Sequence, residues 1–204
     1  MGIVCPRFDQ EIGDPALTVG LSFAAIYAKS EGGGWCDVLR WSQRVIDLAD
    51  GDPSKGNIIF GSPLALAFAT RAFARWYLGR PGWRDDLRHG LAMARSTDPM
   101  SYATGVAYVY GFGIPNGVLR PDDSVVREIE DALRIAERSA DDLALDFTRW
   151  TLGVALVHRQ TAAERDPGEK LLAEVELGRT AGDAVEVRSG LTAGEQVVTS
   201  ANFL

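Results

Sequence analysis

Residues 63–78 read PLALAFATRAFARWYL and are apolar on nearly every side of a helix. Ser62 and Pro63 mark where this helix begins, since serine is a good helix cap and proline is favoured at the first helical position. Arg71 and Arg75 are the charged interruptions. A helix with so little polar surface has to be covered by other elements, so the segment predicts the central helix of a folded domain.

Helical spacing extends outward from this segment, from Pro15 to about Ala173, with short interruptions of Gly, Pro and Asp. On the first segment Leu17, Leu21, Ala24 and Ala28 form an apolar stripe, and residues 35–50 form an amphipathic outer helix. Short connections between helices leave little room for a sheet. Eight helices are predicted, with starts at Asp14-Pro15, Trp35, Ser62-Pro63, Trp83, Asp98-Pro99, Asp122, Asp141 and Asp166-Pro167.

An internal repeat is visible in three helix endings, VIDLAD, LAMARSTD and LRIAERSAD, which place Ala49, Ala94 and Ala136 in equivalent positions 45 and 42 residues apart. A period near 42 with two helices per unit is typical of stacked helical repeats. The predicted fold class is therefore all-α, a tetratricopeptide-like α-solenoid of antiparallel helix pairs with a short β-hairpin tail. Residues 1–173 form the helical-repeat domain, and residues 174–204 form a short β tail that is not an independent domain.

The tail loses the helical spacing and alternates apolar with polar residues between glycines. This pattern predicts an antiparallel hairpin that pairs residues 183–188 with residues 195–200 around the turn SGLTAG. A lone hairpin is marginally stable, so the tail is expected to add little to the stability of the helices.

Composition argues against several kinds of partner and indicates where the protein is located. The 204 residues have a formal net charge of −7, which argues against nucleic acid or an anionic membrane as partner. No stretch approaches the roughly 20 apolar residues of a membrane span, and the first residues lack the features of a secretory signal. Cys5 and Cys36 are too few for a disulfide framework or a four-thiolate zinc site. A cytoplasmic location is expected, with two ordinary buried thiols; the oligomeric state stays open.

Catalytic chemistry is not expected. The chain has no phosphate-binding loop of the form GxxxxGK[ST], and His89 and His158 have no neighbour at metal-ligand spacing. Three acidic pairs, Asp85-Asp86, Asp122-Asp123 and Asp141-Asp142, lie at predicted helix starts, where capping explains them. We therefore expect no catalytic residue, no cofactor and no metal, and no synthesis of cyclic AMP from ATP.

A protein or peptide partner is expected instead, in the concave groove that stacked helix pairs present. The candidate groove residues are Arg71, Arg75, Trp76 and Tyr77. The two arginines could extend to solvent, pair with a nearby aspartate or receive an acidic peptide. The tryptophans are mainly expected in the core, with a ligand-facing patch as the alternative, and Trp76 and Trp83 are predicted to be buried between helices.

Four segments, GDPALTVGL (13–21), RVIDLADGDPSKGNIIFGSPLALA (44–67), LGRPGWRDDL (78–87) and IPNGVL (114–119), show a family resemblance. With them, residues of about 7–172 resemble the C-terminal tetratricopeptide-like region of actinobacterial multidomain adenylate cyclases and AAA ATPase helix-turn-helix regulators. In that family the nucleotide chemistry lies upstream of the helical array. The resemblance thus implies a non-catalytic interaction or sensor module.

The tail has a different resemblance. LGRTAGDAVEVRSGLTAGEQVVTSANFL (177–204) is similar to the C-terminal β segment of periplasmic adaptor subunits of resistance-nodulation-division efflux pumps. There are therefore two alternatives to an interaction module. One is a fragment of an efflux adaptor, which only the tail suggests, and the other is a truncated or chimeric reading frame without a function.

Overall fold

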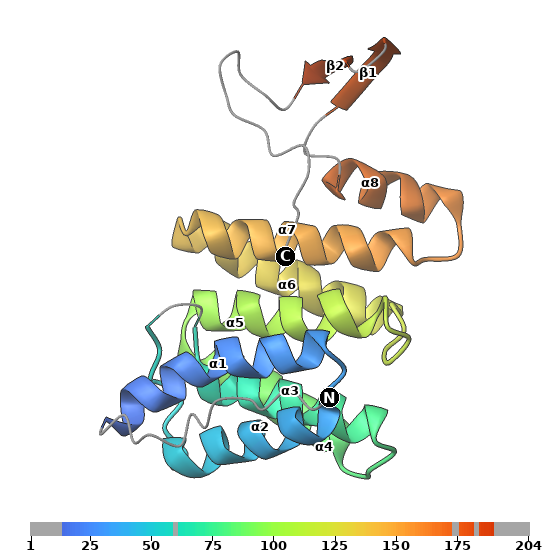
Figure 1. The fold of residues 1–204 in the computed structure, drawn as a ribbon. Helices are drawn as coiled ribbons and strands as arrows, with labels where there is room; N and C mark the ends of the chain where they lie inside the picture. Colours follow the sequence, from blue (N-terminus) through green and yellow to red (C-terminus); the bar gives the residue numbers. More distant parts are fainter. Residues whose placement is uncertain (1–13, 59–60, 173–175, 182–183, 190–204) are drawn as a thin grey trace.

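The computed structural model describes residues 14–58, 61–172, 176–181 and 184–189 (Figure 1). Most of these residues are helical, as the sequence predicts. In chain order the elements are α1 (Pro15–Glu31), α2 (Trp35–Ala49), α3 (Pro63–Tyr77), α4 (Trp83–Thr97), α5 (Pro99–Val106), the π-helix η1 (Ala107–Gly111), α6 (Asp123–Ser139), α7 (Asp142–Val157), α8 (Ala162–Leu172), β1 (Glu176–Ala181) and β2 (Ala184–Ser189).

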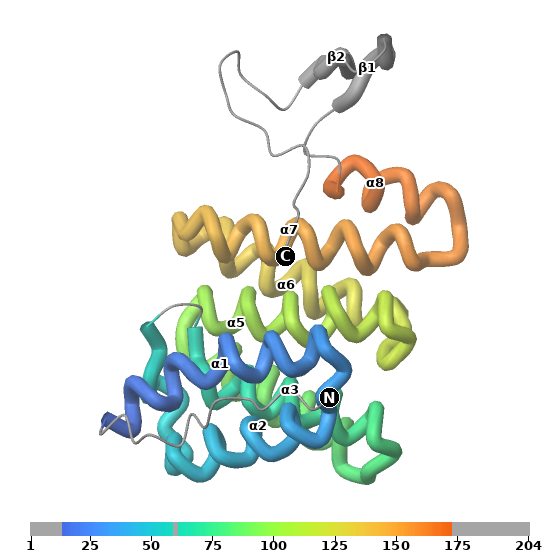
Figure 2. The backbone as a smooth tube through the Cα atoms, viewed as in Figure 1, coloured from blue at the N-terminus to red at the C-terminus, as the bar shows by residue number. Residues whose placement is uncertain are grey.

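The helices are stacked so that each one packs against the next in the chain, from α1 on α2 to α7 on α8. The odd-numbered helices also pack on one another, α1 with α3, α3 with α5 and α5 with α7. Figure 2 follows the chain through this stack, from α1 and α2 at one end to α7 and α8 at the other. The odd-numbered helices thus form one continuous layer.

Helix α3 is the central helix, as the sequence predicts. Ten of its 15 residues are buried, and it contacts α1, α2, α4, α5 and η1. The largest apolar cluster joins Phe73 of α3 to Leu91 of α4, Tyr102 of α5 and Ile129 of α6. The repeat positions Ala49, Ala94 and Ala136 are all buried, at the ends of α2, α4 and α6.

Side-chain caps fix where five helices begin. Each cap has an oxygen that accepts a backbone N–H from the first turn, which satisfies one of the donors that a helix start leaves unpaired. Asp14 accepts from Ala16 at 2.8 Å, and the remaining caps are Ser62, Asp98, Asp122 and Asp141. These starts are the ones that the sequence predicts.

The apolar stripe of α1 faces outward rather than into the core. Leu17 is 40% exposed and Leu21 is 44% exposed, whereas Val19 and Ile26 on the opposite side of the helix are buried. Helix α1 is apolar on both sides, so periodicity alone does not identify the buried one.

Helix α8 begins at Ala162, five residues before the predicted start at Pro167. The sequence TAAE at residues 161–164 forms part of a capping box, in which the Glu164 carboxylate accepts from both the backbone N–H and the hydroxyl of Thr161. Pro167 lies inside the helix as a consequence.

Three burial predictions are wrong. Trp76 and Trp83 are only partly buried, because each lies at an end of its helix beside the turn that joins α3 to α4. Cys36 is an exposed free thiol in the first turn of α2. Cys5 lies outside the described residues.

In the tail, β1 and β2 form an antiparallel pair that aligns Glu176 with Ser189 and Ala181 with Ala184. The predicted pairing of residues 183–188 with residues 195–200 involves a segment outside the described residues, so it stays a prediction.

We expect deletion of residues 178–204 to leave helicity and Tm nearly unchanged. The reason is that a pair of two short strands is at best marginally stable on its own and does not offset the ordering of the chain. Circular dichroism of the full chain and the truncated chain measures both quantities. A collapse of the truncated chain would show that the tail is an integral part of the fold.

Candidate functional site

Arg71 and Arg75, two of the four predicted groove residues, bind a carboxylate inside the protein. Asp86 of α4 is buried and accepts from Nε and Nη2 of Arg71 at 2.9 and 2.6 Å. Nη1 of Arg75 lies 2.7 Å from the same carboxylate. Of the three roles considered for these arginines, the structure shows pairing with an aspartate. The acidic pair Asp85-Asp86 does not cap α4, which begins after Gly82.

Tyr77, the last residue of α3, lies at a different place. Its ring stacks on Trp35 of α2, with centroids 4.0 Å apart and an interplanar angle of 11°. Its hydroxyl donates to Oδ1 of Asn116 at 3.1 Å, and Asn116 in turn donates to the carbonyl of Phe112. Trp76 contacts Tyr77 edge to face at 4.7 Å. Tyr77 is 39% exposed and therefore available to a ligand.

Tyr77 lines a cavity of about 220 Å³ at the ends of α1 and α3, which we call the aromatic pocket. Its other described lining residues come from α1, the start of α2, α3, η1 and the turn that follows. Six of the residues that line it are aromatic, namely Tyr27, Trp35, Phe73, Tyr77, Tyr108 and Phe112, and the rest are Ser30, Glu31, Val38, Thr70 and Asn116.

The π-helix η1 supplies one side of this pocket. Single π-helical turns are rare and are frequent at functional sites, because the wider turn redirects side chains. Tyr108 of η1 contacts Phe73 edge to face at 6.0 Å and Phe112 at 5.2 Å. Tyr110 points instead toward α6, where its hydroxyl donates to Glu128.

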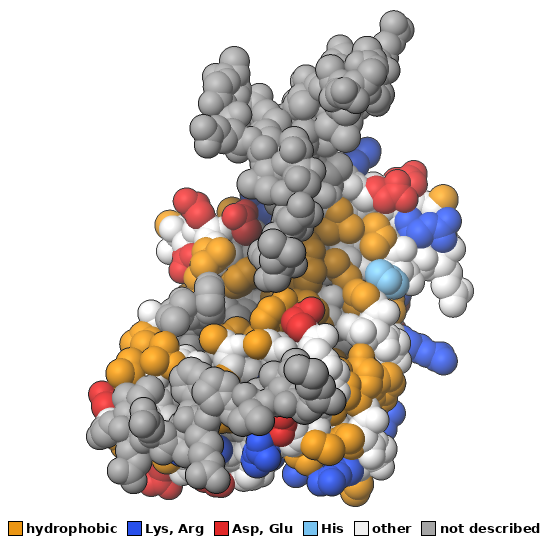
Figure 3. All heavy atoms as spheres, viewed as in Figure 1, with side chains coloured by type: hydrophobic (Ala, Val, Ile, Leu, Met, Phe, Trp, Pro, Cys, Tyr) orange, Lys and Arg blue, Asp and Glu red, His pale blue; other side chains and the backbone are white. Residues whose placement is uncertain are grey.

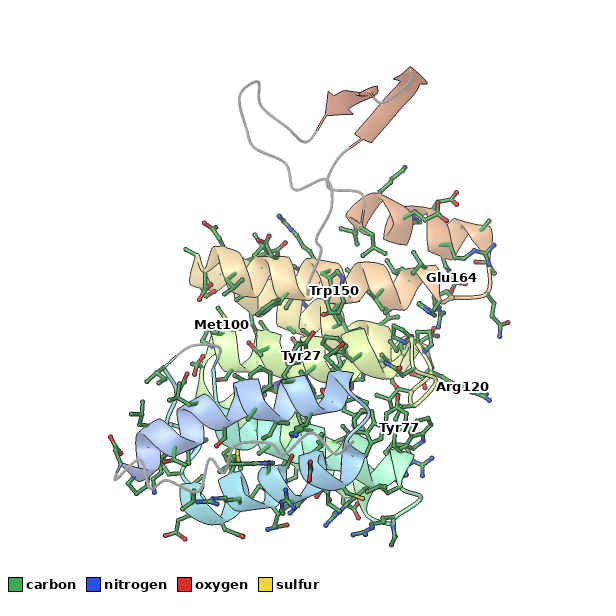
Figure 4. All side chains as sticks on the ribbon, viewed as in Figure 1. Tyr27, Tyr77, Met100, Arg120, Trp150 and Glu164 are labelled. Carbon is green, nitrogen blue, oxygen red and sulfur yellow. The ribbon has the colours of Figure 1, made fainter. Side chains whose placement is uncertain are left out.

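Aromatic surface continues from the pocket onto α7. Trp150 is 38% exposed and its ring lies 5.7 Å from that of Phe112. A Cβ at Gly111 would lie 2.2 Å from the Trp150 ring, so glycine is what allows the ring to cover η1. Figure 4 shows Tyr27, Tyr77 and Trp150 on three helices of the odd-numbered layer. Figure 3 shows hydrophobic side chains gathered over α5 and α7 on the same view.

The lining of the pocket carries little charge. Glu31 is the charged residue among its described lining residues. Burial raises the pKa of Tyr108 to about 12, so this phenol is neutral at physiological pH. Burial also raises the pKa of Tyr27, and the nearby Glu31 carboxylate raises it further.

The buried Tyr108 phenol predicts a loss of stability at high pH. The pKa of Tyr108 is about 12 in the folded protein and close to 10 in an unfolded chain. The folded protein therefore keeps a proton that the unfolded chain loses, and the stabilisation is complete below pH 10 and lost as pH rises to 12. We expect the free energy of unfolding to fall by up to about 1.4 kcal/mol per pH unit as Tyr108 ionises.

Urea unfolding at pH 9, 10 and 11 measures this slope. Tyr108→Phe should make the decline shallower, while Tyr77→Phe, at an exposed side chain, should keep the decline of the wild type. Identical slopes for all three proteins would contradict the role of Tyr108.

A second cavity of about 760 Å³ lies between α2 and the turn that joins α3 to α4, with four arginines in its lining. Three of them already have partners: Arg40 bonds Asp37, Arg75 bonds Asp86, and Arg44 lies over the ring of Trp41. The cavity is a less promising anion site because this charge is largely compensated.

Metal-binding geometry is absent from the part of the chain that the structure describes, where no three His, Cys, Asp or Glu side chains form a suitable group. His89 is exposed and contacts Phe68 edge to face, and His158 follows α7 with its Nδ1 2.8 Å from the carbonyl of Val154. No described helix combines the length and apolar character needed to span a membrane.

Among the aromatic lining residues, the sequence analysis singled out Tyr77 for a partner, gave a ligand-facing patch as the alternative for Trp35, and missed the others. One signal was present: Tyr108, Tyr110 and Phe112 are two residues apart, a spacing that cannot place three rings on one helix face. At least one of them had to leave the core.

Comparison with known proteins gives a match for the tail alone. The family model described as the C-terminal permuted SH3 domain of RND MFPs matches residues 166–202. These residues comprise the second half of α8, β1, β2 and the chain around them. Neither a curated protein nor a solved structure matches the chain.

Proposed function

We propose that the helical part of the chain is a tetratricopeptide-like α-solenoid that acts as a non-catalytic interaction or sensor module. The support for the architecture is the packing of odd-numbered helices on one another and the burial of three alanines at the repeat spacing. In this proposal the module binds a protein or peptide segment on the odd-numbered layer.

The observation that supports this function best is the aromatic pocket with its exposed rings. Tyr27, Tyr77 and Phe112 are each more than one third exposed, and Trp150 extends the same surface. Large apolar side chains grouped around a cavity are typical of interaction sites, where aromatic residues supply much of the binding energy.

A cytoplasmic origin in an adenylate cyclase or ATPase regulator is part of the proposal. It rests on the resemblance of residues 7–172 to that family and on Cys36, since an exposed free thiol is suited to a reducing compartment.

The alternative, a fragment of an efflux adaptor, has the tail match in its favour. It concerns residues 166–202 and gives no role to α1–α7. The two proposals therefore apply to different parts of the chain.

Selection from a displayed random peptide library against the full chain tests the interaction module. We expect enriched peptides to bind, and Tyr77→Ala and Phe112→Ala to weaken that binding at least tenfold. The matched control is Trp83→Ala, a partly buried aromatic residue on α4, outside the pocket lining. Peptides that bind all four proteins equally would exclude the odd-numbered layer as the site.

A further inference from the structure

The aromatic pocket has the size of one chemical group. Ligand pockets for drug-sized molecules are commonly about 300–1,000 Å³, and this one is about 220 Å³. It therefore suits a single head group or side-chain end and not a whole cofactor.

Its rings are arranged around that space from separate elements. Tyr27 comes from α1, Trp35 from α2, Tyr77 from α3 and Tyr108 from η1. Trp35 and Tyr77 stack on each other, so one face of each of these two rings is already covered. A ring face carries partial negative charge and attracts a cation by cation–π interaction.

The ends of three helices, α1, α2 and α3, also lie at the pocket. Both α1 and α3 end at the pocket, at Glu31 and Tyr77, and the carboxyl end of a helix carries partial negative charge. Helix α2 begins there at Trp35, and its positive end is offset by Asp37 in its first turn. Lys29 and Arg75 lie in the last turns of α1 and α3, and Lys29 and Arg40 pair with Asp37. The charges at the helix ends therefore offset one another, and Glu31 is the charged residue that lines the pocket itself.

A neutral apolar group fits this site less well than a cation. Glu31 is exposed at the edge of the pocket and accepts a hydrogen bond from Tyr27, and a neutral group would leave its negative charge without a cationic partner. An organic cation keeps that charge paired while its alkyl groups contact the rings. The formal net charge of −7 for the whole chain also favours the approach of a cation.

We propose that the aromatic pocket binds an alkylammonium group, presented by a lysine or methyl-lysine side chain of the peptide partner. This inference rests on the proposed function and adds the chemistry that the partner must supply. A free quaternary ammonium compound shares this chemistry and serves as a probe of the pocket.

Titration of the full chain with choline tests the pocket, with 3,3-dimethylbutan-1-ol as the neutral molecule of the same shape. The readout is the indole N–H resonance of Trp35, assigned from its loss in Trp35→Phe. We expect saturable binding of choline about tenfold tighter than that of the alcohol, weakening from 20 to 500 mM NaCl.

Two variants and one control locate the binding. Tyr77→Ala removes a ring of the lining and Glu31→Gln removes the carboxylate, and each should weaken choline binding several-fold. Tyr77→Ala should also lower Tm, because the ring stacks on Trp35 and the hydroxyl donates to Asn116, whereas Glu31→Gln should leave the melting curve unchanged. Glu137→Gln, at an exposed position on α6, should bind like the wild type. Equal affinity for choline and the alcohol, or choline binding that neither variant weakens, would overturn the proposal.

A competition experiment with lysine derivatives distinguishes this inference from the proposed function. N-acetyl-trimethyllysine amide and N-acetyl-lysine amide should compete with choline, whereas N-acetyl-norleucine amide should not. Library peptides that lack basic residues yet require Tyr77 would leave the interaction module standing and overturn the alkylammonium site. Failure to select any peptide while choline still binds at Tyr77 would count against the peptide partner alone.

Discussion

Asp86→Ala is expected to lower the free energy of unfolding by about 3–5 kcal/mol, the range for breaking a buried ion pair by removing one partner. The Asp86 side chain is 7% exposed, and the side chains of Arg71 and Arg75 are 11% and 28% exposed. Both guanidinium groups depend on that carboxylate, so its loss leaves two cations poorly solvated between α3 and α4. A loss of this size is a large part of the stability of an ordinary domain.

Urea denaturation followed by circular dichroism measures the effect, and the neighbouring residue supplies the control. Asp85 is 74% exposed and pairs with Arg88 on the surface, so Asp85→Ala should change stability by about 1 kcal/mol or less. Asp86→Asn keeps the shape and one acceptor and should fall between the two. If Asp86→Ala were no worse than Asp85→Ala, the buried network would contribute nothing to stability.

The ion pairs of Asp86 with Arg71 and Arg75 could not be predicted from the sequence. The sequence gives two arginines one turn apart on an apolar helix and an acidic pair at the start of the next helix. Pairing them requires the rotation of α4 about its own axis in the packed structure, which decides whether Asp85 or Asp86 faces α3. Asp86 is the fourth helical residue and faces α3, whereas Asp85 faces solvent.

Helix caps predicted where most of the helices begin, because a cap and the backbone group that it bonds are close together in the sequence. Asp14, Ser62 and Asp98 accept backbone N–H groups two or three residues away, so the chain sequence contains the whole interaction. The start of α8, which the prediction missed, also has a local signal. The capping box at Thr161 and Glu164 is present in the sequence, but Pro167 was taken as the helix start.

The aromatic pocket depends on contacts between residues far apart in the sequence. Trp35 and Tyr77 are brought together by the packing of α2 on α3, and Tyr108 reaches the pocket through a π-helical turn. Neither the register between two helices nor a π-turn follows from hydrophobic periodicity. Composition alone indicates aromatic residues in a core, which is where the tryptophans were mainly expected.

The second large effect on stability is expected at Gly61, where the segment before α3 contacts the first turn of α5. Gly61 has φ +88° and is buried, and a Cβ there would lie 2.6 Å from Cα and 2.9 Å from N of Ser101. The same contact includes the backbone N–H of Ser62, which donates to the Ser101 hydroxyl at 2.8 Å. The Ser101 backbone N–H donates in turn to Asp98, the cap of α5. A side chain at Gly61 therefore has to displace backbone at the start of α5.

Gly61→Ala is expected to cost about 2–5 kcal/mol, because left-handed backbone costs about 1–2 kcal/mol for a residue with a Cβ and overpacking adds about 1–3 kcal/mol. Such a loss should lower Tm by roughly 5–15 °C for a chain of this size. Gly51→Ala is the matched control, since Gly51 has φ +79° and no atom within 4 Å of its added Cβ. It retains the backbone cost without the collision, so it should lower Tm by only about 2–6 °C. Equal shifts in the two variants would show that the segment before α3 can move away from α5, and that the contact between Gly61 and Ser101 does not hold these helices together.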